Sequence, residues 1–145
     1  MNPSPGGYIL DTNYISELVR VKPDVRAVEW IDRVPETSLY LSVITLAEIR
    51  KGVDELAHGA RRVHLNEWLT VTLPGRFSGR VLDVIPEIAD RWGVLAAIGK
   101  RNGTPLPWAD GFLAATALHH RLTLVTRNTR DFAPFGVPTL NPWQT

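Results

Sequence analysis

The segment YILDTN, residues 8–13, carries the clearest structural signal in the chain. Tyr8, Ile9 and Leu10 are typical of a short buried strand, yet the chain runs from them directly into the carboxylate of Asp11. An isolated carboxylate beside a core is unfavourable unless it is paired or takes up a proton. Asp11 therefore requires a partner, and the pattern leaves three open: a helix N-terminus, a cation or a metal ion.

Strand-like and helix-like segments alternate along the rest of the chain. This alternation is typical of an α/β fold with a mostly parallel sheet that is covered on both faces. We expect a single domain over residues 8–145, preceded by a flexible tail at residues 1–7. The predicted strands are residues 8–11, 38–42, 80–84, 122–126 and 137–140, and the predicted helices are residues 14–20, a second one from about 23, 43–57, 86–101 and 109–120, with a turn at HGARR, residues 58–62.

Composition excludes several classes of protein. The 145 residues are 44% hydrophobic, enough for a real core, and the net charge of +1 indicates no partner by itself. There is no cysteine, so disulfides and cysteine-based zinc sites are excluded. The first residues, MNPSPGG, lack the pattern of a signal peptide, and no apolar run approaches the roughly 20 residues that cross a bilayer. We expect a cytoplasmic protein without membrane contact.

Acidic and amide side chains follow the predicted strands. Asp11 ends the first strand, Glu48 lies in the helix after the second, and Asp110 begins the helix before the fourth. Asn128 and Asp131 lie in TRNTRDF, just beyond that fourth strand. Ligands of open parallel sheets gather at the carboxyl ends of the strands, so we expect these side chains to lie close together.

Each acid also has a purely structural interpretation. Asp11 and Asp110 could cap helices, and Asp131 could form a local turn. Glu48 follows Thr45 by three residues, which is the spacing of a capping box. Together, however, carboxylates at one edge would repel each other, and a hard divalent cation such as Mg²⁺ removes that repulsion.

Two further features bear on this metal hypothesis. The histidines offer no zinc alternative, because His119 and His120 are adjacent and cannot share one helix face, while His58 and His64 fall in an expected surface region. Gly52 lies four residues after Glu48 and would leave the space beside that carboxylate open. Close packing of two helices is the alternative explanation for this glycine.

Four segments together resemble a PIN-domain ribonuclease, most closely a VapC-like toxin of the FitB type: ILDTNYISEL, YLSVITLAEIRKGV, WADGFLAATALHHRLTLVTRNTRDF and the terminal NPW. The resemblance implies a Rossmann-like three-layer α/β/α sandwich and an acidic cluster that binds Mg²⁺, or Mn²⁺ as a substitute, and cleaves RNA. It implies that Asp11, Glu48 and Asp110 are the core acids. Thr12, Asn13 and Thr126 match polar positions of the family.

The chain departs from this family at one position. The fourth acid often follows the TR pair directly, where this chain has Asn128, so Asp131 is expected to supply the fourth carboxylate. We expect Thr12, Asn13, Thr126, Asn128 and Arg127 to support the ligands or contact phosphate; Arg50 and Arg130 are near enough in sequence to do the same.

The resemblance also implies partners: a cognate VapB-like antitoxin, an RNA substrate and a second copy of the chain in a homodimer. Two other functions remain open. One is a catalytically inactive PIN domain that acts as a binding module, which Asn128 keeps in consideration. The other is a phosphoacceptor signalling domain, although that would need a lysine at a late strand end. A phosphatase of the haloacid dehalogenase type would need an aspartate where Asn13 stands.

Overall fold

The structure is a computed structural model and describes residues 6–144. Its centre is one five-stranded sheet in which every pair of neighbouring strands is parallel. The strand order is β3-β2-β1-β4-β5, so the first strand is central. The strands are β1 (Tyr8–Leu10), β2 (Leu39–Ser42), β3 (Val81–Leu82), β4 (Thr123–Val125) and β5 (Thr139–Leu140).

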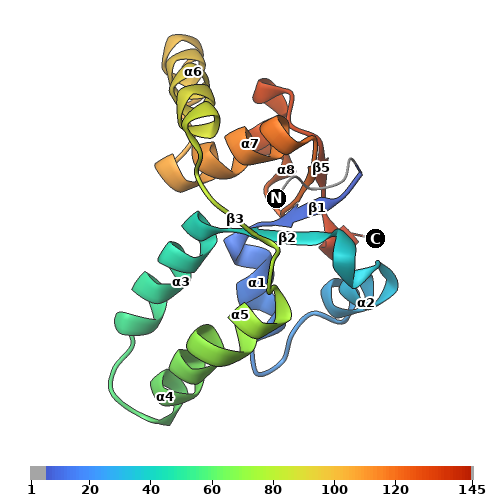
Figure 1. Ribbon diagram of the computed structural model, residues 1–145, viewed down its shortest axis with the longest axis vertical. Coiled ribbons are helices and arrows are strands. Elements are labelled where there is room, and N and C mark those ends of the chain that lie inside the picture. The colour runs from blue at the N-terminus through green and yellow to red at the C-terminus, as the bar shows by residue number, and fades with distance from the viewer. Residues whose placement is uncertain (1–5, 145) are drawn as a thin grey trace.

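Helices cover both faces of this sheet (Figure 1). Alternate strand residues point to opposite sides, as the period of a strand requires. Ile9 and Leu124 belong to the core cluster under α6 and α7, whereas Leu10 and Val125 belong to the cluster with α1, α2 and α3. The helices are α1 (Thr12–Leu18), α2 (Val25–Arg33), α3 (Val43–Asp54), α4 (Ala60–Glu67), α5 (Leu73–Arg76), α6 (Pro86–Asn102), α7 (Trp108–His120) and α8 (Thr129–Phe132).

The predicted three-layer fold with a parallel sheet is thus confirmed. The turn expected at residues 58–62 is wrong in its extent, because α4 begins at Ala60 and includes both arginines of that segment. Helical backbone then continues through a π-helical segment, Trp68–Thr72, into α5. Gly59 is the N-cap of α4, and the alanine and arginines that follow it are good helix formers, so the helix begins directly after the glycine.

Residues 1–5 of the expected N-terminal tail lie outside the described residues. Gly7 is buried, and its carbonyl accepts a hydrogen bond of 3.0 Å from the amide of Thr123. A side chain at this position would meet the Ser38 carbonyl at 3.0 Å, so the close approach requires glycine. Within residues 6–144, no helix has the length and apolar character needed to span a bilayer.

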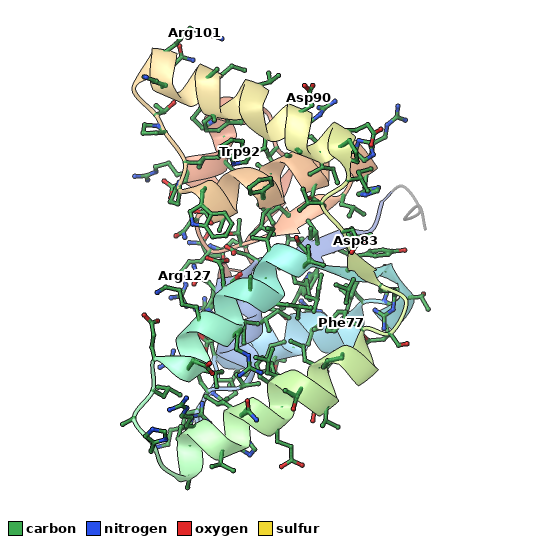
Figure 2. All side chains as sticks on the ribbon, turned by 60° about the vertical axis from the view of Figure 1, so that its left-hand side comes forward. Phe77, Asp83, Asp90, Trp92, Arg101 and Arg127 are labelled. Carbon is green, nitrogen blue, oxygen red and sulfur yellow. The ribbon has the colours of Figure 1, made fainter. Side chains whose placement is uncertain are left out.

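The layer formed by α6 and α7 depends on one close contact. Figure 2 shows Trp92 of α6 directed toward α7, and its indole Nε1 donates a 3.1 Å hydrogen bond to the carbonyl of Trp108. Trp92 also stacks on Phe112, with ring centroids 5.1 Å apart. Gly111 provides the room, because a Cβ there would lie 2.8 Å from Nε1 of Trp92.

Replacing Gly111 with alanine should destabilise the protein even though alanine favours helix. We expect a net loss of about 1–2 kcal/mol in the free energy of unfolding, because overpacking costs more than the helix propensity regained. The matched control is Gly93→Ala in α6, where a Cβ meets nothing within 4 Å. The control should be neutral or stabilising; equal effects of the two substitutions in urea unfolding would contradict this account of the helix contact.

Candidate active site

Asp11 lies at the carboxyl end of the central strand and is only 3% exposed. Its amide donates a 3.0 Å hydrogen bond to the carbonyl of Val125, which extends the pairing of β1 with β4 by one residue. The same register brings the hydroxyl of Thr126 to Asp11, where it donates to Oδ2 at 2.7 Å. Burial raises the pKa of Asp11, the Thr126 hydrogen bond opposes this, and the charge of Glu48 raises the pKa further. The side chain makes no capping hydrogen bond to α1, so its main partner is Thr126.

Glu48 reaches the same place from α3. The hydroxyl of Thr12, the first residue of α1, donates to Oε1 of Glu48. The hydroxyls of Thr12 and Thr45 are 3.3 Å apart. The capping-box interpretation of Thr45 and Glu48 is wrong, because the N-cap lies three residues earlier: Ser42 occupies it, and its hydroxyl accepts a 3.0 Å hydrogen bond from the amide of Ile44.

Asp110 lies in the first turn of α7 and is partly buried. The N-cap of this helix is Pro107, so Asp110 does not occupy the capping position. Burial raises the pKa of Asp110 to about 6, and the charges of Asp11, Glu48 and Asp131 add to the effect. The charges of all the other candidate acids therefore act on Asp110. We call Asp11, Glu48 and Asp110 the acidic edge.

The remaining candidate site residues lie in the segment after β4. The hydroxyl of Thr126 accepts a 3.1 Å hydrogen bond from the amide of Asn128, so it holds this loop as well as Asp11. Asp131, in α8, is exposed, and its charge reaches Asp110. Asn128 is partly buried without a capping hydrogen bond from its side chain, and Asn13 is exposed. The roles expected for Asn128 and Asn13 stay predictions.

The residues of the acidic edge fit a hard divalent cation by their chemistry. Every donor is an oxygen, from carboxylates and neighbouring threonine hydroxyls. Burial raises the pKa values of Asp11 and Asp110, and a cation relieves the repulsion between carboxylates that raises them further. Among residues 6–144, no three His, Cys, Asp or Glu side chains already converge as a formed metal site. The carboxylates instead accept hydrogen bonds from Thr126 and Thr12.

Glu17 is a buried carboxylate that sequence reasoning missed. Burial alone would raise its pKa, but the amide of Asp24, at 2.9 Å, and the guanidinium of Arg20 outweigh burial and lower the pKa. Arg127 lies 3.6 Å from the same carboxylate, and its guanidinium stacks over the ring of Trp143 at 4.2 Å. Glu17 thus helps to hold the arginine that follows Thr126.

The side chain of Arg50 is directed toward α4 and not toward the acidic edge. Its guanidinium donates 2.9 Å hydrogen bonds to Asp54 and Asn66, which tie α3 to α4. The suggestion that Arg50 contacts phosphate therefore finds no support in its geometry. Figure 2 shows Arg127, in contrast, at the margin of the molecule beside α3.

A groove leads away from Glu48 between α1, α3 and α4. A pocket of about 220 Å³ is lined there by Thr12, Glu48 and Gly52 together with apolar residues such as Leu56 and Trp68. A Cβ at Gly52 would meet nothing within 4 Å. Close helix packing does not explain this glycine; it leaves open the space beside Glu48, as expected.

The fold is that of a known family. The PIN domain family matches residues 8–136, and the chain belongs to that family. It is similar to Toxin FitB of Neisseria gonorrhoeae, with 39% identity over 93% of this chain and 97% of that protein. It is also similar to VapC ribonuclease Y4jK of Sinorhizobium fredii, with 38% identity over 94% of this chain and 97% of that protein.

The solved structures agree. The crystal structure of FitAcB from Neisseria gonorrhoeae superposes with a TM-score of 0.89 at 38% identity, and the match covers 95% of this chain and 99% of that chain. The resemblance inferred from the four sequence segments is therefore confirmed.

The raised pKa of Asp110 predicts how stability depends on pH without metal. Between about pH 4 and pH 6 the folded carboxyl holds a proton that the unfolded chain has released, so this group makes the folded state more stable as pH falls through 6. Asp110→Asn should remove that dependence and stabilise the protein at pH 7.5 by about 1 kcal/mol, discounted for solvent screening because the side chain is partly exposed.

Urea unfolding in EDTA at pH 5, 6 and 7.5 measures this difference. The comparison with the variant is needed because the raised pKa of Asp11 acts with the same sign and the lowered pKa of His120 acts with the opposite sign. The lowered pKa values of Glu17 and Glu36 act only at more acidic pH. The control is Asp83→Asn, an exposed aspartate that follows β3 and lies far from Arg127 in Figure 2. If both substitutions gave the same pH profile, the raised pKa of Asp110 would be disproved.

Proposed function

We propose that this protein is a metal-dependent endoribonuclease and the toxin of a toxin–antitoxin pair. The observation that carries the proposal is that Asp110 lies near enough to Asp11 and Glu48 for their charges to add to burial in raising the pKa of Asp110 to about 6. A relative of similar length bears the name ribonuclease, and another bears the name toxin, which supports the same activity for this chain.

Asp11, Glu48 and Asp110 would hold Mg²⁺, with Mn²⁺ as a substitute, and Asp131 would add a further carboxylate at the rim. The cation would supply a polarised water and neutralise the charge that develops on the phosphate. The chain's own part is to orient its carboxylates. Thr126 fixes the rotation of Asp11, and Thr12 fixes that of Glu48.

Arg127 is the cation best placed to bind the phosphate backbone. It follows Thr126 directly, and it is oriented by Glu17 on one side and by the ring of Trp143 on the other. A guanidinium held in this way loses little side-chain entropy when it forms two hydrogen bonds to a phosphate. Because Glu17 offsets part of its charge, Arg127 would orient the RNA more than it raises overall affinity.

A VapB-like antitoxin would inhibit the enzyme by placing a segment in the groove beside Gly52. This groove has apolar walls and ends at Glu48, so an apolar segment with one basic side chain fits its chemistry. The similarity to a protein named Toxin FitB and to the FitAcB structure supports a partner of this kind. A homodimer in the cytoplasm is part of the same proposal.

An inactive binding module is the second candidate, and Asn128 in place of an acid is the observation that favours it. It predicts binding of Mn²⁺ or RNA without cleavage. A phosphoacceptor domain is disfavoured, because none of Lys22, Lys51 and Lys100 lies at the end of a strand.

Asp11→Asn should reduce metal-dependent RNA cleavage at least about a hundredfold, because it removes a ligand charge at the centre of the site. The measurement is cleavage of a mixed structured RNA by the purified protein, free of antitoxin, in Mg²⁺, Mn²⁺ or EDTA. Asp83→Asn serves as the control and should keep full activity. The melting temperature of Asp11→Asn should equal or exceed that of the wild type.

Three results distinguish the candidates. Cleavage that needs metal and is lost in Asp11→Asn supports the nuclease. Metal or RNA binding without any cleavage by folded wild type favours the binding module. Cleavage that persists equally in EDTA and in Asp11→Asn would show that the acidic edge is not the active site.

A further inference from the structure

A second pocket is connected to the acidic edge through Asp131. It has a volume of about 470 Å³ and is lined by the loop of residues 103–107 on one side and by Arg130, Asp131 and Pro134 on the other. Asp131 joins the two sites, because its carboxylate lines this pocket and its charge also raises the pKa of Asp110. The pocket therefore borders the place where a phosphate would be cut.

The loop that forms one wall is held by backbone contacts of its own. Gly103 has φ of +69°, which ends α6 in a left-handed conformation. The amide of Thr104 donates a 2.9 Å hydrogen bond to the carbonyl of Gly99, and a Cβ at Gly99 would approach Pro105 Cα to 3.1 Å. Pro105 and Pro107 restrict the backbone further. A preformed wall of this kind loses little conformational entropy on binding.

The charged side chains of this pocket have no pairing partner among the described residues. Within residues 6–144, the guanidinium of Arg130 and the carboxylate of Asp131 take part in no hydrogen bond or ion pair with another residue. Arg130 and Asp131 are adjacent in α8 and therefore do not pair with each other, whereas Arg50 with Asp54 and Lys51 with Glu55 are four residues apart and do pair. A free cation and a free anion at one pocket offer both donors and acceptors to a ligand.

We propose that this pocket binds one unpaired guanine base of the RNA substrate, next to the scissile phosphate; this rests on the proposed nuclease function. Guanine presents two acceptors, O6 and N7, on one edge, which match the paired donors of an arginine. It presents two donors, N1–H and N2–H, on the adjacent edge, which match a carboxylate. The flat faces of the base would lie against Leu106 and the prolines of the two walls.

The remaining bases match these two side chains less well. Adenine has an acceptor and a donor where guanine has two acceptors, so it offers Arg130 one partner fewer. Uracil and cytosine lack N7. A base within an A-form helix cannot reach the pocket, because sequence readout of RNA needs unstacked bases. The substrate class is therefore RNA that presents a guanosine in a loop or single strand.

The test is binding of fluorescein-labelled RNA hairpins to Asp11→Asn protein in Mg²⁺, so that affinity is read without cleavage. The hairpins share one stem, and the single guanosine of the loop is replaced by adenosine, inosine or 7-deazaguanosine. Inosine lacks the 2-amino group that Asp131 would accept, and 7-deazaguanosine lacks the N7 that Arg130 would contact. We expect guanosine to bind about tenfold more tightly than adenosine.

Two further substitutions, each made in the Asp11→Asn protein, test the contacts of Arg130 and Asp131 separately. Arg130→Ala should remove the preference for guanosine over 7-deazaguanosine and keep the preference over inosine; Asp131→Asn should do the reverse. Arg33→Ala, an exposed arginine of α2, is the control and should preserve both preferences. Leu106→Trp should fill the pocket and abolish all base preference, with folding checked by circular dichroism.

Equal affinity for all four hairpins, or preferences that survive both Arg130→Ala and Asp131→Asn, would overturn the base-binding pocket. If wild type still cleaves RNA with metal, only this inference fails. If wild type neither binds nor cleaves RNA, the proposed function fails with it.

Discussion

The hydrogen bond between the hydroxyl of Thr126 and the carboxylate of Asp11 joins residues that are 115 positions apart in the chain. It forms because β1 and β4 are parallel neighbours in a register that pairs Leu10 with Val125, so the next residue of each strand leaves the sheet at the same point. Thr126 also accepts a hydrogen bond from the amide of Asn128, which orients the loop that carries Arg127 and Asp131. The central pairing of the sheet thus sets the positions of the acids, the arginine and the pocket beyond them.

The carboxylates of the acidic edge lower the stability of the folded protein, and the rest of the fold compensates for this loss. Asp11 is buried among apolar strands, and the carboxylates around Asp110 raise its pKa. The two apolar clusters on either face of the sheet supply the stability that permits this arrangement. Functional sites commonly retain such local repulsion, because the groups that destabilise the free protein are those that bind the ligand.

The order of strands and helices could be predicted because apolar period and turn residues are local properties of the sequence. The electrostatic contact of Asp110 with Asp11 and Glu48 followed from the rule that parallel strands end at one edge, although the roles of these acids stay predictions. Glu17 could not be predicted, because its burial depends on Arg127 and Trp143, which are distant in sequence. The N-cap of α3 was missed for a different reason: Ser42 and Thr45 are both capable N-caps, and only the end of β2 selects Ser42.

Calorimetric titration of the metal-free protein with Mn²⁺ at pH 6 and pH 7.5, each in two buffers that differ in ionisation enthalpy, tests the central claim most directly. The account predicts saturable binding at both values of pH, with protons released on binding at pH 6 because Asp110 has a pKa of about 6 and must ionise to bind the cation. Release should be smaller at pH 7.5, and Asp11→Asn should weaken binding strongly. Absence of Mn²⁺ binding by folded wild type, or binding that Asp11→Asn leaves unchanged, would contradict the account.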